Sequence, residues 1–239
     1  MALPKIYDWE RIRKALKQLA EAFPDGFQDW ILVGGGACWF YRVVLERADD
    51  HMFRVPDLTP EEEATWLSKD IDFMGLSPEA AELLLRASRN EETHTIAFAG
   101  LEVDFVESGL RITPETVNRN YREVRTPEFV FQVVDAALLY AEKISLLQAK
   151  ARAQDRLHAR LLAEYLKYEF CFEAEHAADL DASDWVQRAR IVKIADYEFF
   201  VRDARAPQRL ARAVARLQAP EHKAVVHWAR HHLPHDAAS

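Results

Sequence analysis

The spacing of apolar positions divides the chain into a part that mixes helices with short strands and a later part that is helical. Residues 8–22 carry apolar side chains at helical spacing, and Asp8 can cap that helix. The short apolar run 30–33 predicts a buried strand, and the glycines after it lead into a buried helix over 37–46. A long helix is expected from Asp135 to Tyr168. From Asp135 onward the sequence has only helical patterns and no strand pattern.

Short elements are expected between these segments. We predict an excursion at 48–66 with a helix from Thr59, a strand at 70–74, a helix at 77–89 with Ala81, Leu84 and Leu85 inward, a hairpin at 93–106, a helix from Thr113, and a strand at 129–134. Further helices are expected at 183–203, 208–218 and 220–232, with a break at Pro207. The sequence therefore predicts an α+β fold: a mixed sheet flanked by helices over residues 1–134, then an all-helical domain over residues 135–239.

Composition narrows the functional classes. The 239 residues are 49% hydrophobic and 29% charged, with a net charge of -8, so the chain as a whole is not a polycation for nucleic acid. Its two cysteines, Cys38 and Cys171, do not suggest a disulfide framework. The sequence has no apolar signal core near Met1 and no apolar run of membrane-spanning length. We therefore expect a cytoplasmic protein without a membrane partner.

The strand at 70–74 carries the most distinctive chemistry. Asp70 and Asp72 are two residues apart, so in a strand they share one face while Ile71 and Phe73 point to the other. Two neighbouring carboxylates raise each other's pKa unless a cation lies between them. Carboxylate oxygens with substrate phosphates suit Mg²⁺. A lone Asp-x-Asp is also typical of a solvated strand end, so the motif needs support from the rest of the chain.

That support comes from a glycine turn and a further acidic strand. Gly34 and Gly35 follow the first strand, and glycines allow the backbone to approach phosphates at the start of a helix. The second strand of the predicted hairpin carries Glu102 and Asp104 on one face by parity, so either is a candidate third acid.

This order resembles the nucleotidyltransferase superfamily with a polymerase-beta-like fold, and most closely the bacterial branch that includes abortive-infection toxin nucleotidyltransferases. The resemblance covers residues 27–160 and rests on Val33-Gly34-Gly35, the pair Asp70 and Asp72, and Val103-Asp104-Phe105. In that branch a Ser or Thr stands just before the acid pair, as Ser68 does here. A later helix there carries a lysine, a basic residue and an Asp, which Lys143, Lys150 or Arg152, and Asp155 match loosely.

The resemblance implies an enzyme that moves a nucleoside monophosphate from an NTP to a hydroxyl and releases pyrophosphate. Asp70, Asp72 and Asp104 would be the catalytic and Mg²⁺-binding residues, with Asp104 helping to deprotonate the acceptor. The nucleotide would be bound by Gly34, Gly35, Ser68 and Lys143, although Lys143 is equally well explained as a solvated helix lysine. The acceptor stays open between RNA, protein and a small molecule, and a toxin–antitoxin setting would add an antitoxin partner.

Two departures keep alternatives open. The interval from Gly35 to Asp70 is longer than in the superfamily because of the 48–66 excursion, and Trp66 stands where an arginine is common. A non-catalytic relative that binds nucleotides or a partner protein is therefore the alternative. A magnesium-dependent phosphodiesterase that uses the same acids is a weaker one.

A second basic feature lies in the helical part. Arg209, Arg212 and Arg216 follow at steps of three and four, so they share one helix face. They could contact the phosphates of an RNA acceptor, or form an ordinary solvated face. The acidic net charge favours the solvated face.

Overall fold

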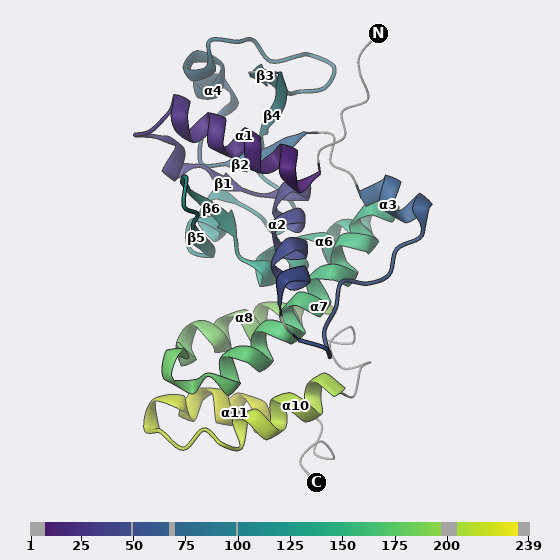
Figure 1. The fold of residues 1–239 in the computed structure, drawn as a ribbon, viewed down its shortest axis with the longest axis vertical. Coiled ribbons are helices and arrows are strands. Elements are labelled where there is room, and N and C mark those ends of the chain that lie inside the picture. Colours follow the sequence, from purple (N-terminus) through teal and green to yellow (C-terminus); the bar gives the residue numbers. More distant parts are fainter. Residues whose placement is uncertain (1–7, 49, 67–69, 99, 197–204, 234–239) are drawn as a thin grey trace.

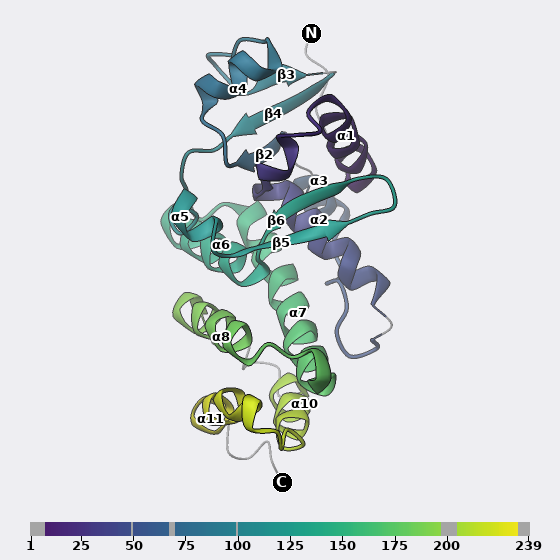
Figure 2. The same ribbon diagram turned by 90° about the vertical axis from the view of Figure 1, so that its left-hand side faces the viewer.

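The computed structural model describes residues 8–48, 50–66, 70–98, 100–196 and 205–233. The predicted nucleotide-binding residue Ser68 lies outside these ranges. The chain forms an α+β structure in which the strands gather in the upper half and long helices extend below them (Figures 1 and 2). Within the described part, no helix is both long enough and apolar enough to cross a membrane.

A six-stranded mixed sheet forms one end of the molecule, in the order β3-β4-β2-β1-β6-β5. Its strands are β1 (Ile31–Leu32), β2 (Ile71–Met74), β3 (Ile96–Phe98), β4 (Leu101–Phe105), β5 (Tyr121–Arg125) and β6 (Val130–Val134). The pairs β2–β4 and β1–β6 are parallel, and the other three pairs are antiparallel. In the described residues no strand follows Val134, as predicted.

Helices flank the sheet and form the lower half of the molecule (Figure 1). They are α1 (Trp9–Ala22), α2 (Gly34–Arg47), α3 (Pro60–Trp66), α4 (Pro78–Leu85), α5 (Pro114–Val117), α6 (Ala136–Lys150), α7 (Ala153–Glu175), α8 (Ala182–Asp196), α10 (Arg205–Val214) and α11 (Lys223–His232), with short 3-10 turns at Phe27–Asp29, Ala177–Asp179 and Pro220–His222. Several predicted start signals are confirmed. The Asp8 carboxylate accepts from the backbone N–H of Arg11, and Thr113 forms a capping box with Thr116.

Aromatic side chains fill the core beneath the sheet. Trp30 precedes β1 and contacts Phe73 of β2 and Phe105 of β4 edge-on, with ring centroids 5.8 and 5.0 Å apart. Phe27 adds a further edge-on contact to Phe73. These contacts hold β1, β2 and β4 in fixed relative positions, and the predicted acids lie on β4 and at β2.

The long helix predicted from Asp135 to Tyr168 is wrong, because the structure has two helices there. Ala151 adopts a left-handed conformation with φ 49° and Arg152 an extended one, so the chain reverses between α6 and α7. No Gly or Pro marks this reversal in the sequence. It has a direct consequence for the site, because α7 packs back along α6.

Two smaller predictions are corrected as well, and one strand lies where none was expected. Pro207 does not break a helix, because it lies in the first turn of α10, where a missing N–H is tolerated. Leu84 is 42% exposed and does not face inward; only the narrow stripe of Pro78, Ala81 and Leu85 on this two-turn helix is buried. The sequence does not predict the sheet-edge strand β5, because three of the five residues in Tyr121–Arg125 are charged.

Candidate active site

Asp72 and Asp104 lie directly opposite each other on the neighbouring parallel strands β2 and β4. Ile71 and Val103, the pair before them, are fully buried on the other face. Asp70 immediately precedes β2 and is close enough for its charge to raise the pKa of both Asp72 and Asp104. The structure thus brings together the three acids that the sequence singled out.

The two candidates for the third acid differ in their partners. Asp104 is paired with Asp72 in the strand register, whereas Glu102 lies two residues earlier on β4 and is paired with Ala97 of β3. The charge of Asp104 also raises the pKa of Asp72. The register therefore favours Asp104 as the acid that acts together with Asp72.

The glycine turn lies against Asp72. Gly34 begins α2 with a φ of 59°, in the left-handed region that favours glycine. A Cβ added at Gly34 would overlap the Asp72 carboxylate, at 2.6 Å from its Cγ. The backbone N–H of Val33 donates to the Asp72 carbonyl at 2.9 Å, which fixes the turn to β2. The glycines are thus the first turn of α2 itself, and the lack of a side chain at Gly34 makes room for the acid.

Burial and like charge act on the same carboxylates. The pKa of Asp72 is raised to about 8, first by burial and then by the charge of Asp70, while Lys143 and the Gly35 backbone N–H act in the opposite direction. Burial and Asp70 also raise the pKa of Asp104. This site would therefore gain from a bound cation, which favours the charged forms of the acids.

The donor set fits a hard divalent cation, since all three groups are carboxylates and two of them, Asp72 and Asp104, are paired across adjacent strands. Among the described residues, however, no three His, Cys, Asp or Glu side chains stand in a ready metal-binding arrangement. The acids are neighbours on adjacent strands without forming a closed coordination shell.

The reversal between α6 and α7 brings Lys143 to the same region. On one continuous helix Lys143 and Asp155 would be about 18 Å apart. In the structure Lys143 Nζ lies 3.3 Å from Asp155 Oδ1, and Arg152 Nε lies 2.7 Å from Asp155 Oδ2. Lys143 and Asp155 are both buried, so the alternative of a solvated helix lysine is wrong. Of the two basic residues considered, Arg152 contacts Asp155.

Cys38 on α2 lies among these charged groups. Burial raises the pKa of its thiol to about 12, and the charges of Lys143, Asp155 and Asp72 also act on it. The thiol is therefore protonated at neutral pH and is not a nucleophile. Its environment shows that the start of α2, the acid pair and the α6–α7 hairpin converge.

A buried aromatic cluster borders this region and was missed by sequence reasoning. Trp66, at the end of the 48–66 excursion, contacts Trp39 of α2 and His158 of α7, with ring centroids 5.9 and 4.7 Å apart. His158 is fully buried, and neither of its ring nitrogens makes a hydrogen bond of normal geometry. Burial and then Lys143 lower its pKa well below the usual value, so the ring is neutral. A single His in a helical pattern gave no signal of this position.

The excursion itself packs against the helices. Arg42 of α2 pairs with Glu63 of α3 at 2.9 Å, and its guanidinium lies over the Trp39 ring. Arg160 of α7 pairs with Glu62 of α3 at 3.1 Å. Trp66 is thus a buried packing residue at the end of α3.

Neither the models of known protein families nor the curated proteins give a match to this chain. The functional assignment therefore rests on the site itself.

Proposed function

We propose that this chain is a nucleotidyltransferase that moves a nucleoside monophosphate from an NTP to a hydroxyl acceptor. The observation that carries the proposal is the position of Asp72, which is opposite Asp104 and under the first turn of α2 at Gly34. Acids and a phosphate-binding helix start are thereby close together. Either feature alone is common, and their direct contact is what supports this chemistry.

The start of α2 would bind the phosphates of the nucleotide. α2 is a 14-residue helix that begins with three glycines, and its N-cap residue Val33 makes no side-chain cap hydrogen bond. The Gly35 N–H acts on the Asp72 carboxylate. The other N–H groups of the first turn and the positive dipole end would favour an anion, and the absent side chains would let a phosphate approach closely. Gly34 and Gly35 would thus act through their backbone.

The acids would hold Mg²⁺ and receive a proton. When bound, Mg²⁺ supplies charge stabilisation at the α-phosphate and at the leaving pyrophosphate. The acceptor oxygen forms a bond to the α-phosphorus, the bond from that phosphorus to the bridging oxygen breaks, and pyrophosphate leaves. Asp104 accepts the proton of the acceptor hydroxyl. Bound Mg²⁺ would keep Asp104 in the charged form, which is the form that can accept a proton.

Lys143 would contribute positive charge near the phosphates. Asp155 holds its ammonium group in place, and Arg152 supports Asp155 in turn. Lys143 and Asp155 follow residue 134, so the site would use both halves of the proposed layout: a nucleotidyltransferase domain at 1–134 and a helical domain at 135–239.

The test is label transfer from α-labelled NTPs, with Mg²⁺ and RNA, protein or small hydroxyl acceptors, together with pyrophosphate release. We expect the double variant Asp70→Asn plus Asp72→Asn to lose at least 100-fold in rate. The matched control is Asp25→Asn plus Asp57→Asn, which removes two exposed acids and should keep full activity. Equal label transfer by the acid-site variant and wild type would contradict the assignment.

A non-catalytic nucleotide-binding protein of the same fold is the second candidate. It is favoured by the absence, in the described residues, of a ready three-ligand metal arrangement. Calorimetry with Mg²⁺ and a non-hydrolysable NTP separates the two. Binding that depends on Asp72, without transfer to any acceptor, would support the binding protein, and pyrophosphate release supports the enzyme.

A further inference from the structure

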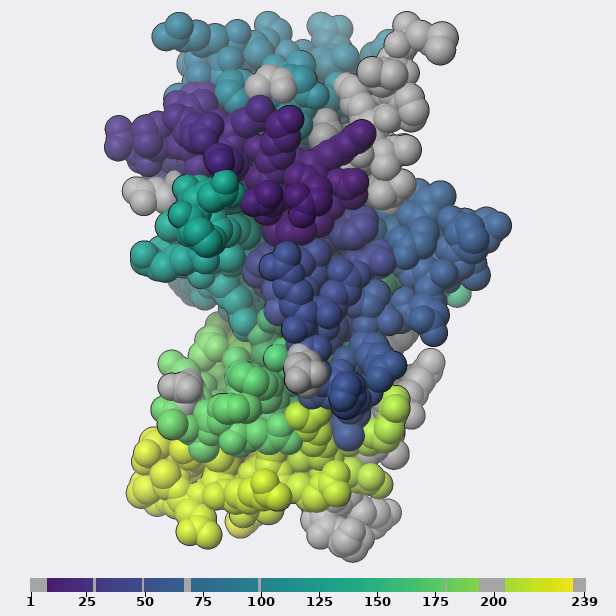
Figure 3. Space-filling view, viewed as in Figure 1, coloured from purple at the N-terminus to yellow at the C-terminus, as the bar shows by residue number. Residues whose placement is uncertain are grey.

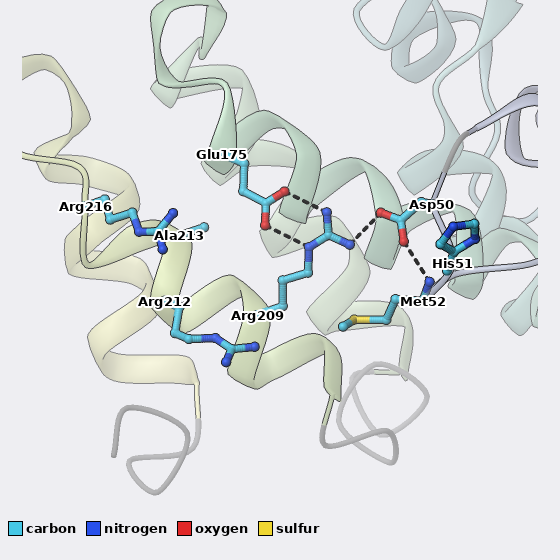
Figure 4. A pocket seen from close by; sticks show the side chains of 8 residues that line it. All are labelled: Asp50, His51, Met52, Glu175, Arg209, Arg212, Ala213 and Arg216. Atoms are coloured by element: carbon cyan, nitrogen blue, oxygen red, sulfur yellow. Dashed lines mark hydrogen bonds and ion pairs between the residues drawn. The ribbon is translucent and has the colours of Figure 1, made fainter.

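A cavity of about 540 Å³ lies at the far end of α7 from the acids. It lies between the segment that follows α2, the last turn of α7 and helix α10 (Figure 4). In the space-filling view the segment after α2, in blue, abuts the yellow-green surface of α10 (Figure 3). Asp50, Glu175 and the three arginines Arg209, Arg212 and Arg216 line it. The face that the sequence predicted for these arginines is thus one wall of a cavity.

Arg209 forms a fixed part of this wall. Its guanidinium contacts both oxygens of Glu175, at 2.7 and 2.6 Å, and also pairs with Asp50. It lies over the ring of Phe53, with its Cζ 5.5 Å from the centroid. Both carboxylates of the cavity are therefore engaged by the same arginine, as Figure 4 shows.

Among the residues that the structure describes, the side chains of Arg212 and Arg216 have no such partner. Neither guanidinium group makes a hydrogen bond or ion pair within this part of the chain, and both residues line the cavity. In a chain of net charge -8, two guanidinium groups without an ion pair to any described residue, beside a cavity whose acids are already paired, form a local excess of positive charge. Guanidinium groups bind phosphate with two parallel hydrogen bonds, which a single lysine cannot do.

We propose that this cavity, the Arg212/Arg216 pocket, binds a phosphate group. The phosphate is either a free one, such as inorganic phosphate or pyrophosphate, or a phosphodiester of a single-stranded nucleic acid. The pocket is separate from the acid site, because α7 spans the 20 residues from Asp155 to Glu175, about 30 Å. A triphosphate held at Gly34 could not reach it. The proposal therefore stands whether or not the chain transfers nucleotides.

The test uses the full chain and two probes. Calorimetry measures pyrophosphate binding, and fluorescence anisotropy measures binding of a labelled 12-nucleotide single-stranded RNA. The test variant is Arg212→Gln plus Arg216→Gln. The matched control is Lys223→Gln plus Arg230→Gln, which removes two exposed charges from α11. Circular dichroism melting checks that both variants fold.

We expect the pocket variant to bind at least tenfold more weakly and the control to bind as wild type. If pyrophosphate binding shows this loss, the pocket takes a free phosphate. If only RNA binding shows the loss, the phosphate comes from a nucleic-acid backbone. In that case the slope of log K for RNA against log salt concentration should become shallower by about 1.4 in the pocket variant, because each of two lost phosphate contacts contributes about 0.7. Equal binding by wild type and the pocket variant, or an equal loss in the control, would overturn the proposal. So would a loss in Asp72→Asn as large as that in the pocket variant when Mg²⁺ is present, since the anion would then lie at a metal ion held by the acids.

Discussion

Gly34 and Asp72 are in direct contact, although 38 positions separate them in the sequence. The glycine has a left-handed backbone, and the space that its side chain would fill is taken by the carboxylate of the acid. The close approach requires both the turn after β1 and the pairing of β1 with β2. A substitution at this one glycine thus changes the geometry of the acid site directly.

Replacing Gly34 with Ala should therefore destabilise the protein and disturb Asp72. The left-handed backbone alone costs roughly 1–2 kcal/mol with a Cβ, and the overlap with Asp72 adds to it. Two control variants separate these effects in urea denaturation. At Gly100 the backbone is left-handed, with φ 79°, but an added Cβ would meet no atom, so Gly100→Ala should show the backbone cost alone. At Gly26 the backbone is not left-handed and an added Cβ would also meet no atom, so Gly26→Ala should be neutral. A Gly34→Ala variant no less stable than Gly100→Ala would show that the overlap is relieved without cost.

Asp72 should make the cation-free protein less stable as pH rises. Its folded pKa, about 8, is above its ordinary value of 3.8, so the folded state holds a proton that the unfolded state has lost. Between pH 4 and 8 the free energy of unfolding therefore falls with increasing pH. Since one pKa unit corresponds to about 1.4 kcal/mol, Asp72→Asn should be more stable than wild type by a few kcal/mol at pH 8 in EDTA.

The measurement is urea denaturation at pH 5, 6, 7 and 8, with Asp25→Asn as the exposed control. The gain of the Asp72 variant should grow across this series and shrink when Mg²⁺ is added, because a bound cation would favour the charged acid. A gain that is the same at every pH would contradict the prediction.

The parts of the site that the sequence predicts are those set by local rules. The two-residue spacing of Asp70 and Asp72 fixes their common face in any strand, and a hairpin around Gly100 puts Asp104 on the second strand of that hairpin. The parallel pairing of this strand with β2 depends on packing and not on a local rule. The glycines before α2 likewise indicate a close backbone approach. These features need only the alternation of strand side chains and the conformational freedom of glycine.

The parts that the sequence does not predict depend on packing between distant segments. The reversal at Ala151 has no Gly or Pro, so the interaction of Lys143 with Asp155 could not be foreseen from spacing along one helix. His158 is buried because Trp66 packs against it from the 48–66 excursion, whose path no local pattern determines. Edge strand β5 is polar, so it carried no strong strand signal.

The buried pair of Lys143 and Asp155 should respond unequally to loss of each partner. Asp155→Asn leaves the buried ammonium of Lys143 without its ion pair, which typically costs about 3–5 kcal/mol. Lys143→Met leaves Asp155 paired with Arg152, so it should cost less. Urea denaturation of both variants at pH 7 measures the difference, and Lys143→Met being the less stable of the two would show that Arg152 does not compensate Asp155.

His158 should destabilise the protein at acidic pH, in the opposite sense to Asp72. Its folded pKa lies well below the ordinary 6.5, so the unfolded state binds a proton that the folded state excludes. Stability is therefore full above pH 6.5 and falls as the pH is lowered below it.

Replacing the ring by Phe also removes two buried polar atoms that lack hydrogen bonds, which by itself is neutral or stabilising. We expect His158→Phe to be as stable as wild type at pH 7.5 and more stable at pH 5, with the exposed His231→Gln variant as control. Urea denaturation at the two pH values tests this, and an equal loss of stability on acidification in wild type and His158→Phe would mean that another group carries the acid sensitivity.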